Sequence, residues 1–167
     1  MFNLKSSIQR AQRRLEGRGL STRRKRSDRG TLRMDLSVQS KLRTLLSGHD
    51  RPSMKQVMFD LNSYCKRRSL RCPSRATLYQ FLNKVELPTI RVASLPPTVK
   101  QALYNFTDSS EVPEHQLAFY CLNYGDVPAM SFAAGLPWLA LYQAARMRGW
   151  RPKSRGLLRA IMKTRRI

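Results

Sequence analysis

Four polar side chains in the stretch PSRATLYQFLNKV, residues 73–85, have the chemistry needed to recognise nucleic-acid bases. The amides of Gln and Asn can hydrogen-bond two edge atoms of adenine in the major groove of duplex DNA, and a guanidinium can do the same for guanine. The sequence therefore predicts base contacts by Gln80 and Asn83, with Arg75 reaching guanine or a phosphate and Tyr79 flanking the same face.

A helix over about residues 75–85 would hold these four side chains together. Pro73 disfavours helix at the residue before it, and Ser74 is a good N-cap. At about 100° of rotation per residue, the apolar residues fall on one side and the polar ones opposite. The apolar side comprises Leu78, Phe81, Leu82 and Val85. An amphipathic core helix without a binding role has the same pattern, so both interpretations stay open.

Two helices are predicted before this one. Ser37 can cap the first, Gly48 is placed to end it, and its apolar residues recur at helical spacing. These residues are Val38, Leu42, Leu45 and Leu46. In the second, Ser53 and Gln56 have the spacing of a capping box. Its apolar face comprises Val57, Met58, Leu61, Tyr64 and Cys65, and its end is basic.

The segment SRATLYQFL resembles the third helix of prokaryotic helix-turn-helix and winged-helix regulators, in which a capped helix carries a Thr-aliphatic-Tyr sequence. The resemblance covers residues 37–85. It implies base contact by Arg75, Gln80, Asn83 and Tyr79, with Lys66, Arg67 and Arg68 near the DNA backbone. Cations in the last turn of a helix also favour its dipole, so the basic triplet has a structural explanation too.

The charge of the chain points to a polyanionic partner. Among 167 residues, 32 are Lys or Arg and 10 are Asp or Glu, which gives a formal net charge of +22. This excess favours nucleic acid over an anionic membrane surface. The residues predicted to contact phosphates are Arg23, Arg24, Lys25, Arg26, Lys66, Arg67, Arg68, Lys84, Arg151, Lys153 and Arg155.

Residues 1–33 are predicted to form a flexible basic arm with room for a short helix. They hold eleven basic residues and two acids, and the run RGLSTRRKRSDRG mixes charge with Gly and Ser, so it cannot bury an apolar face. Such a segment is either a solvated tail or an arm that follows a phosphate backbone or enters a minor groove.

Residues 34–95 are predicted to be a helix-turn-helix-like unit, and residues 96–167 a second helical module. One short β-strand, Thr89 to Ala93, is expected between them. Helices should begin at Pro97 and at Pro113, and Gly125 should end the second. A last helix, capped by Ser154, has one apolar and one basic face. The apolar face comprises Leu157, Leu158, Ile161 and Met162, and the basic face Arg159, Lys163 and Arg166.

Residues 127–145 are uncharged over 19 positions, near the length that spans a bilayer. Two prolines and a glycine interrupt them, and GLP at 135–137 predicts a helix end, a turn and a helix start. A buried helical hairpin is therefore expected, with no membrane span. Ser131, Gly135 and Leu141 also have helix-turn-helix spacing, but the helix from Pro137 is apolar all round, which favours a structural or dimer-forming role.

Catalytic and metal-binding patterns are absent from the sequence. His49 and His115 stand apart, and Cys65, Cys72 and Cys121 have no paired spacing. The cysteines therefore predict buried thiols in a reducing compartment, and without a secretory signal the expected location is cytoplasmic.

These observations predict a mainly helical, non-enzymatic protein without cofactors that binds double-stranded DNA sequence-specifically and regulates transcription. One alternative is an RNA-binding or nucleoid-type basic protein, which would bind through charge with little sequence preference. Another is an antitoxin-like interaction protein. In that case, or in a homodimer, the apolar segment 127–145 would meet the partner.

Overall fold

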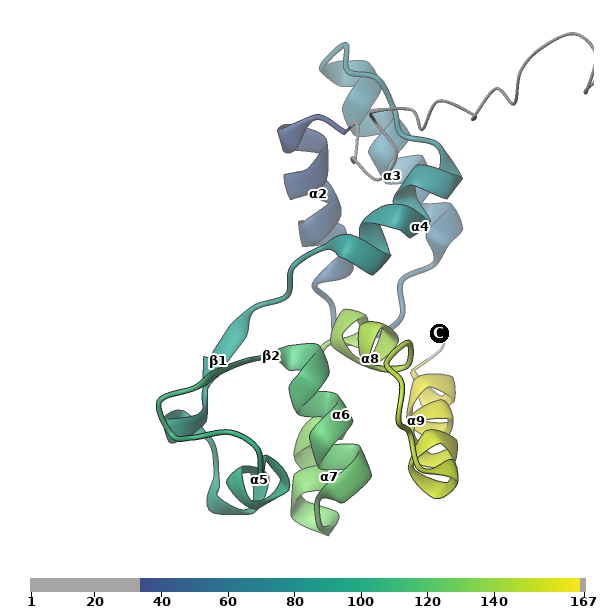
Figure 1. Cartoon of the computed structure of the whole chain (residues 1–167). Coiled ribbons are helices and arrows are strands. Elements are labelled where there is room, and N and C mark those ends of the chain that lie inside the picture. Colours follow the sequence, from purple (N-terminus) through teal and green to yellow (C-terminus); the bar gives the residue numbers. More distant parts are fainter. Residues whose placement is uncertain (1–33, 166–167) are drawn as a thin grey trace, which may run out of the picture. The chain divides into compact units, whose positions relative to one another are not determined.

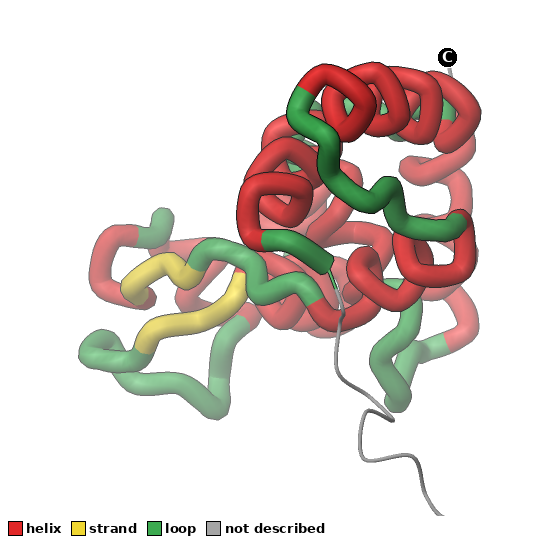
Figure 2. Tube along the Cα trace, turned by 90° about the horizontal axis from the view of Figure 1, so that it is seen from above, coloured by secondary structure: helices red, strands yellow, loops and turns green. Residues whose placement is uncertain are grey.

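Helices dominate residues 34–165, the part of the chain that this computed structural model describes. In this part the chain forms eight α-helices, one 3-10 turn and one two-stranded sheet (Figure 1). Figure 2 shows the same arrangement from above, with the two short strands set among helices. The fold is therefore mainly helical, as the sequence predicts. The basic arm, with Arg23, Arg24, Lys25 and Arg26, lies outside the described residues.

Three helices build a first hydrophobic cluster: α2 (Leu36–Leu46), α3 (Met54–Arg67) and α4 (Arg75–Lys84). α2 packs against α3, and α4 covers both with its apolar side. The buried members from these helices are Val38, Leu42, Leu46, Val57, Leu61, Cys65, Leu78, Phe81 and Leu82, joined by Val85. The predicted apolar side of α4 is thus confirmed.

Of the four predicted N-caps, Ser37, Ser53, Ser74 and Ser154, the structure confirms one. Ser74 Oγ accepts a hydrogen bond from the Thr77 amide at 3.2 Å. α2 is capped by Asp35 instead of Ser37, because the Asp35 carboxylate accepts a 2.8 Å hydrogen bond from the Ser37 amide. A hydrogen bond from the Ser37 hydroxyl, together with this one from the Ser37 amide, holds the pKa of the Asp35 carboxyl below its ordinary value.

The predicted capping box at the start of α3 does not form. Ser53 makes no side-chain capping bond there. Gln56 donates instead to Asp60 Oδ1, one turn further on, at 2.9 Å. The prediction was wrong because an acceptor four residues away on the helix surface competes for the same amide.

The C-terminus of α3 is closed by a Schellman motif built on a serine. The Leu70 amide donates to Cys65 O at 2.9 Å and the Ser69 amide to Lys66 O at 3.3 Å. Ser69 has φ = 54°, the left-handed conformation in which glycine is usual at this position. The following link, residues 68–74, turns back along α3 before α4 begins (Figure 1).

Two strands, not one, follow α4. β1 (Thr89–Arg91) pairs antiparallel with β2 (Glu111–Pro113), with Ile90 opposite Val112. Between them lie the 3-10 turn η1 (Val92–Ser94) and α5 (Pro97–Ala102). Three residues ending in proline are too short for alternation to show, so no residue pattern predicted β2.

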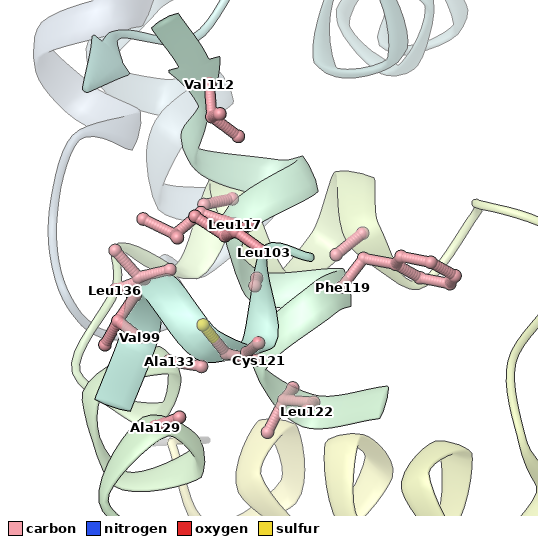
Figure 3. Close-up of a cluster of buried hydrophobic side chains, with 14 of the residues drawn as sticks. Val99, Leu103, Val112, Leu117, Phe119, Cys121, Leu122, Ala129, Ala133 and Leu136 are labelled. Carbon is pink, nitrogen blue, oxygen red and sulfur yellow. The ribbon is translucent and has the colours of Figure 1, made fainter. Parts of the chain in front are cut away.

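A second hydrophobic cluster surrounds α6 (Glu114–Tyr124), which contacts α5, α7 (Val127–Ala134), α8 (Trp138–Ala144) and α9 (Pro152–Thr164). Figure 3 shows side chains of α5, α6 and α7 meeting at its centre. They include Val99, Leu117, Cys121, Leu122, Ala129 and Ala133.

The predicted breaks between these helices are confirmed at Gly125 and at residues 135–137. Gly125 is required because a Cβ there would overlap Cys121 O and lie 2.7 Å from the Cβ of Ala129. No helix within residues 34–165 is long and apolar enough to cross a membrane.

α9 begins at Pro152 with Arg151 as its N-cap residue, so the predicted cap at Ser154 was wrong. Proline is well suited to the first helical position, and the helix starts there. Leu158 is fully buried, Ile161 and Met162 are half-buried, and Leu157 remains exposed. Arg159 and Lys163 lie on the exposed side, as predicted, and Arg166 is outside the described residues.

α8 belongs to both hydrophobic clusters. Trp138 and Leu139 lie in the first, whereas Ala140, Leu141 and Ala144 lie in the second. Along the chain, the buried residues of the first cluster extend to Val85 and those of the second begin at Val92, whereas the predicted boundary was residue 95. Trp138 and Leu139 of α8 are the exception, because they pack in the first cluster. Most of the apolar residues of 127–145 are therefore buried in the chain's own core.

Ser69 offers a test of the backbone conformation at the end of α3. Ser69→Gly should raise the free energy of unfolding by about 0.5–1 kcal/mol, because glycine adopts positive φ without steric cost. Ser69→Val should lower it by about 1–2 kcal/mol, since a β-branched residue is strained there. Urea denaturation measures both. Equal stability of the two variants would show that this turn does not hold positive φ in solution.

Candidate nucleic-acid interface

Exposed polar residues lie at both ends of α4: Arg75 and Gln80 in the first two turns, and Asn83 and Lys84 in the last turn. Arg75, Ala76 and Gln80 are exposed, and Tyr79 is half-buried against the first cluster. The guanidinium of Arg75 lies 5.9 Å from the centroid of the Tyr79 ring, a cation–π contact that orients it. Three of the four predicted base-contacting residues thus lie on the N-terminal half of α4.

A hollow of about 350 Å³ adjoins this half of α4. The start of α3 and the chain just before it form one wall, and α4 forms the other. The lining residues are Arg51, Pro52, Ser53, Met54, Lys55, Arg75 and Tyr79. Three of them are cationic and none is acidic. We call this hollow the basic groove; it is suited to an anion such as a phosphate of a nucleic-acid backbone.

The basic groove shows that the start of α4 lies beside the start of α3. In a tight helix-turn-helix the second helix begins where the first one ends. Here the link doubles back, and α3 has 14 residues and is roughly 20 Å long. Lys66, Arg67 and Arg68 lie at its far end, so the structure does not bring them to the basic groove.

Buried hydrogen bonds hold the loop that carries Arg51. The Arg165 guanidinium, 7% exposed, donates to His49 O at 3.1 Å and to Leu136 O at 2.6 Å. The Arg51 amide donates to Arg165 O at 3.2 Å. Desolvation lowers the pKa of Arg165, and the nearby Asp50 carboxylate opposes that shift. The end of α9 therefore fixes one wall of the basic groove.

Asn83 differs from the other predicted base-contacting residues. Its Oδ1 accepts a 3.3 Å hydrogen bond from the Tyr142 hydroxyl of α8. Beside it, Gln143 Nε2 donates to Leu82 O at 3.0 Å and to Val85 O at 2.8 Å. The C-terminal end of α4 is thus docked on α8. A bidentate contact with adenine needs both polar atoms of the amide, and one of those in Asn83 is engaged.

The remaining predicted phosphate-contacting residues lie in several places. Arg67 donates to Ser63 O at 3.3 Å, and the Arg68 guanidinium lies 4.9 Å from the Tyr64 ring centroid. Lys66 and Lys84 are exposed. Arg151, Lys153 and Arg155 are exposed at the start of α9. There they line hollows other than the basic groove, one shared with Tyr124 and one with Arg146 and Arg148.

Sequence reasoning missed Arg51 and Lys55. A signal for them exists, because Lys55 lies in the first turn of α3 and Arg75 is the first residue of α4. The positive end of the helix dipole disfavours cations at both positions. Neither first turn holds an acid. A bound anion would offset the unfavourable interaction of these cations with the helix dipoles, so cations at helix N-termini are a signal for an anion site.

Cys65 and Cys72 lie close enough to interact, but the residues considered for metal binding form no three-ligand site in the described part of the chain. Within residues 34–165, no three His, Cys, Asp or Glu side chains gather where they could hold a metal ion. Burial lowers the pKa of His115 and raises the pKa of the Cys121 thiol to about 12. Cys65, Cys72 and Cys121 are free thiols, and burial also raises the pKa of Cys72.

Comparison with known proteins yields no family model, no curated protein and no solved structure with a significant match to this chain.

The docking of α4 on α8 can be tested at Gln143. Gln143→Met keeps the length of the side chain but leaves two carbonyl groups without their donor. It should lower the free energy of unfolding by about 1–3 kcal/mol. Tyr142→Phe is the matched control, because it removes one exposed hydrogen bond worth at most about 1 kcal/mol. Urea denaturation measures the free energy of unfolding of both variants. If both lose the same amount, the two hydrogen bonds of Gln143 do not hold α4 more strongly than the single bond of Tyr142.

Proposed function

We propose that this protein binds double-stranded DNA sequence-specifically through the first two turns of α4 and the basic groove. The observation that carries the proposal is that Arg75 and Tyr79 line the basic groove with Arg51 and Lys55, that no acid lines it, and that Gln80 is exposed next to Tyr79 in α4. Base-contacting helices commonly present their N-terminal residues to the major groove, and cations beside them hold the phosphates.

The docking of α4 supports this orientation. α4 has 10 residues and is roughly 15 Å long, and its C-terminal end is hydrogen-bonded to α8. We assign the N-terminal part of α4 to the major groove, which is about 12 Å wide, because the C-terminal end is held against α8. In this proposal Arg75 and Gln80 contact base edges, Tyr79 supports Arg75, and Arg51 and Lys55 contact flanking phosphates. Asn83 serves the contact between α4 and α8.

The use that we assign to this binding is regulation of transcription in the cytoplasm. A formal net charge of +22 supplies attraction to any nucleic acid, so specificity has to come from the exposed groups of α4. Selecting bound sequences from random duplex DNA is the decisive experiment. An enriched motif supports the proposal. Equal affinity for duplex DNA, duplex RNA and single strands, with no motif, would identify a basic protein that binds by charge alone.

Gln80→Ala should weaken binding to the selected duplex by about five- to a hundred-fold, because a bidentate contact discriminates between bases by about 1–3 kcal/mol. Neither the affinity for random duplex nor the melting temperature should change appreciably, since Gln80 is exposed on a helix that tolerates alanine. Arg75→Ala should weaken both, and the selected duplex more. Fluorescence anisotropy measures these affinities.

Two controls accompany Gln80→Ala. Asn83→Ala should leave the preference for the selected duplex unchanged, because Asn83 faces Tyr142. Leu78→Ala should lower the melting temperature and all binding together, since it opens a cavity in a fully buried site at a cost of about 2–5 kcal/mol. If Gln80→Ala weakens selected and random duplex equally, α4 does not recognise bases.

The basic groove predicts a salt dependence. Each phosphate contact contributes about 0.9 to the slope of log affinity against log salt concentration for duplex DNA. Arg51→Gln combined with Lys55→Gln should therefore flatten the slope by about 2. Lys100→Gln is the control for net charge, because the Lys100 ammonium lies 3.3 Å from the Asp108 carboxylate. If Lys100→Gln changes the salt slope by as much per removed charge as the double variant does, the basic groove has no specific role in binding.

A further inference from the structure

An aromatic cluster adjoins the second hydrophobic cluster, outside the proposed duplex-binding surface. Six rings meet mostly edge to face, with centroids 4.9–6.3 Å apart. They belong to Tyr104, Phe106, Phe119, Tyr120, Tyr124 and Trp150. Tyr104 is 61% exposed and Tyr124 is 36% exposed, although Phe119 behind them is buried. The packing of the fold accounts for the inner rings but not for the exposure of Tyr104.

Two cations lie beside the outer rings. The guanidinium of Arg151 is 4.6 Å from the centroid of the Tyr124 ring, and the Tyr124 ring is 5.3 Å from that of Tyr104. Arg151 and Lys153 also line a hollow of about 600 Å³ together with Tyr124. No acidic residue lines it. The carboxylate of Asp126, next to this hollow in the sequence, caps α7 through the Ala129 amide at 2.9 Å.

A buried asparagine holds this arrangement in place. Asn123 is 3% exposed; its Nδ2 donates to Gly149 O at 3.0 Å and its Oδ1 accepts from the Arg151 amide at 3.0 Å. Trp150 Nε1 donates to Ala144 O at 3.0 Å. The backbone of Arg151 is thus fixed against α6 and its side chain lies over Tyr124, so the ring and the guanidinium are arranged before any ligand arrives.

We propose that Tyr104 and Tyr124, with Arg151 and Lys153, form a binding site for single-stranded nucleic acid, in which an unpaired base stacks on the exposed ring of Tyr104. Arg151 and Lys153 contact the phosphates on either side of that base. Aromatic rings beside cations bind unpaired bases in this way, largely without regard to base identity. In a duplex the base faces are covered by their neighbours, so this site selects unpaired strands.

The test uses the full chain and two probes of the same length: labelled oligothymidylate of about 15 nucleotides, and the same backbone with abasic sites. Both probes measure phosphate binding, and only the first measures stacking. Tyr104→Ala should weaken oligothymidylate binding by about five- to a hundred-fold and leave the abasic strand unaffected. Tyr104→Phe should retain binding, because the ring is kept. Arg151→Gln should weaken both probes.

Phe59→Ala is the matched control, since Phe59 is an aromatic residue of α3 that is 65% exposed and far from this cluster in the sequence. It should change neither affinity. Equal binding of the two probes by the unaltered protein would overturn the proposal, and so would an equal effect of Tyr104→Ala on both. These measurements involve no duplex, so their outcome is independent of whether α4 recognises bases.

Discussion

The two hydrogen bonds from the Gln143 amide to Leu82 O and Val85 O fix the orientation of α4. The last carbonyl groups of a helix have no partner within the helix and need donors from elsewhere. α4 ends without a glycine, because the chain goes straight into extended conformation at Val85. The donor therefore comes from a residue about 60 positions away in the chain, on α8. This contact holds the C-terminal end of α4 against α8, and Arg75, Ala76 and Gln80 are exposed in its first two turns.

α8 is the element through which the two hydrophobic clusters are joined. It has seven residues, far fewer than an isolated helix needs to be stable in water, so it exists because both clusters bury it. Trp138 and Tyr142 stack with ring centroids 5.1 Å apart on the side that faces α4. Leu141 lies on the other side, in the cluster around α6. A ligand that displaces α4 would therefore act on the α6 cluster through α8.

The parts of the fold that could be predicted from the sequence are those set by neighbouring residues. α4 was predictable because Ser74 lies directly before it and its apolar residues share one side. The breaks at Gly125 and at residues 135–137 were predictable for the same reason. The cap at Asp35 was missed although it is local, because Ser37 and Asp35 both have capping side chains and the sequence does not rank them.

The contacts that shape the candidate site join residues far apart in the chain, and periodicity carries no information about them. Arg165 meets His49 across 116 positions, and Gln143 meets Leu82 across 61. Composition alone suggested that Asn83 resembles Gln80, whereas a bond from Tyr142 separates the two. β2 was missed because its three residues form a strand only against β1.

The placement of charge links the stability of this protein to its ligands. Cations at the start of a helix are unfavourable by about 0.3–1 kcal/mol each, and α3, α4 and α9 all have cations there without an acid in the first turn. Around the basic groove, Arg51, Lys55 and Arg75 also repel one another. A phosphate bound among these cations would weaken both their unfavourable interaction with the helix dipoles and their mutual repulsion in the folded state. In the unfolded chain the charges are dispersed, so a bound phosphate would stabilise it less. If the proposed polyanion binds in the basic groove, it should therefore also stabilise the first cluster.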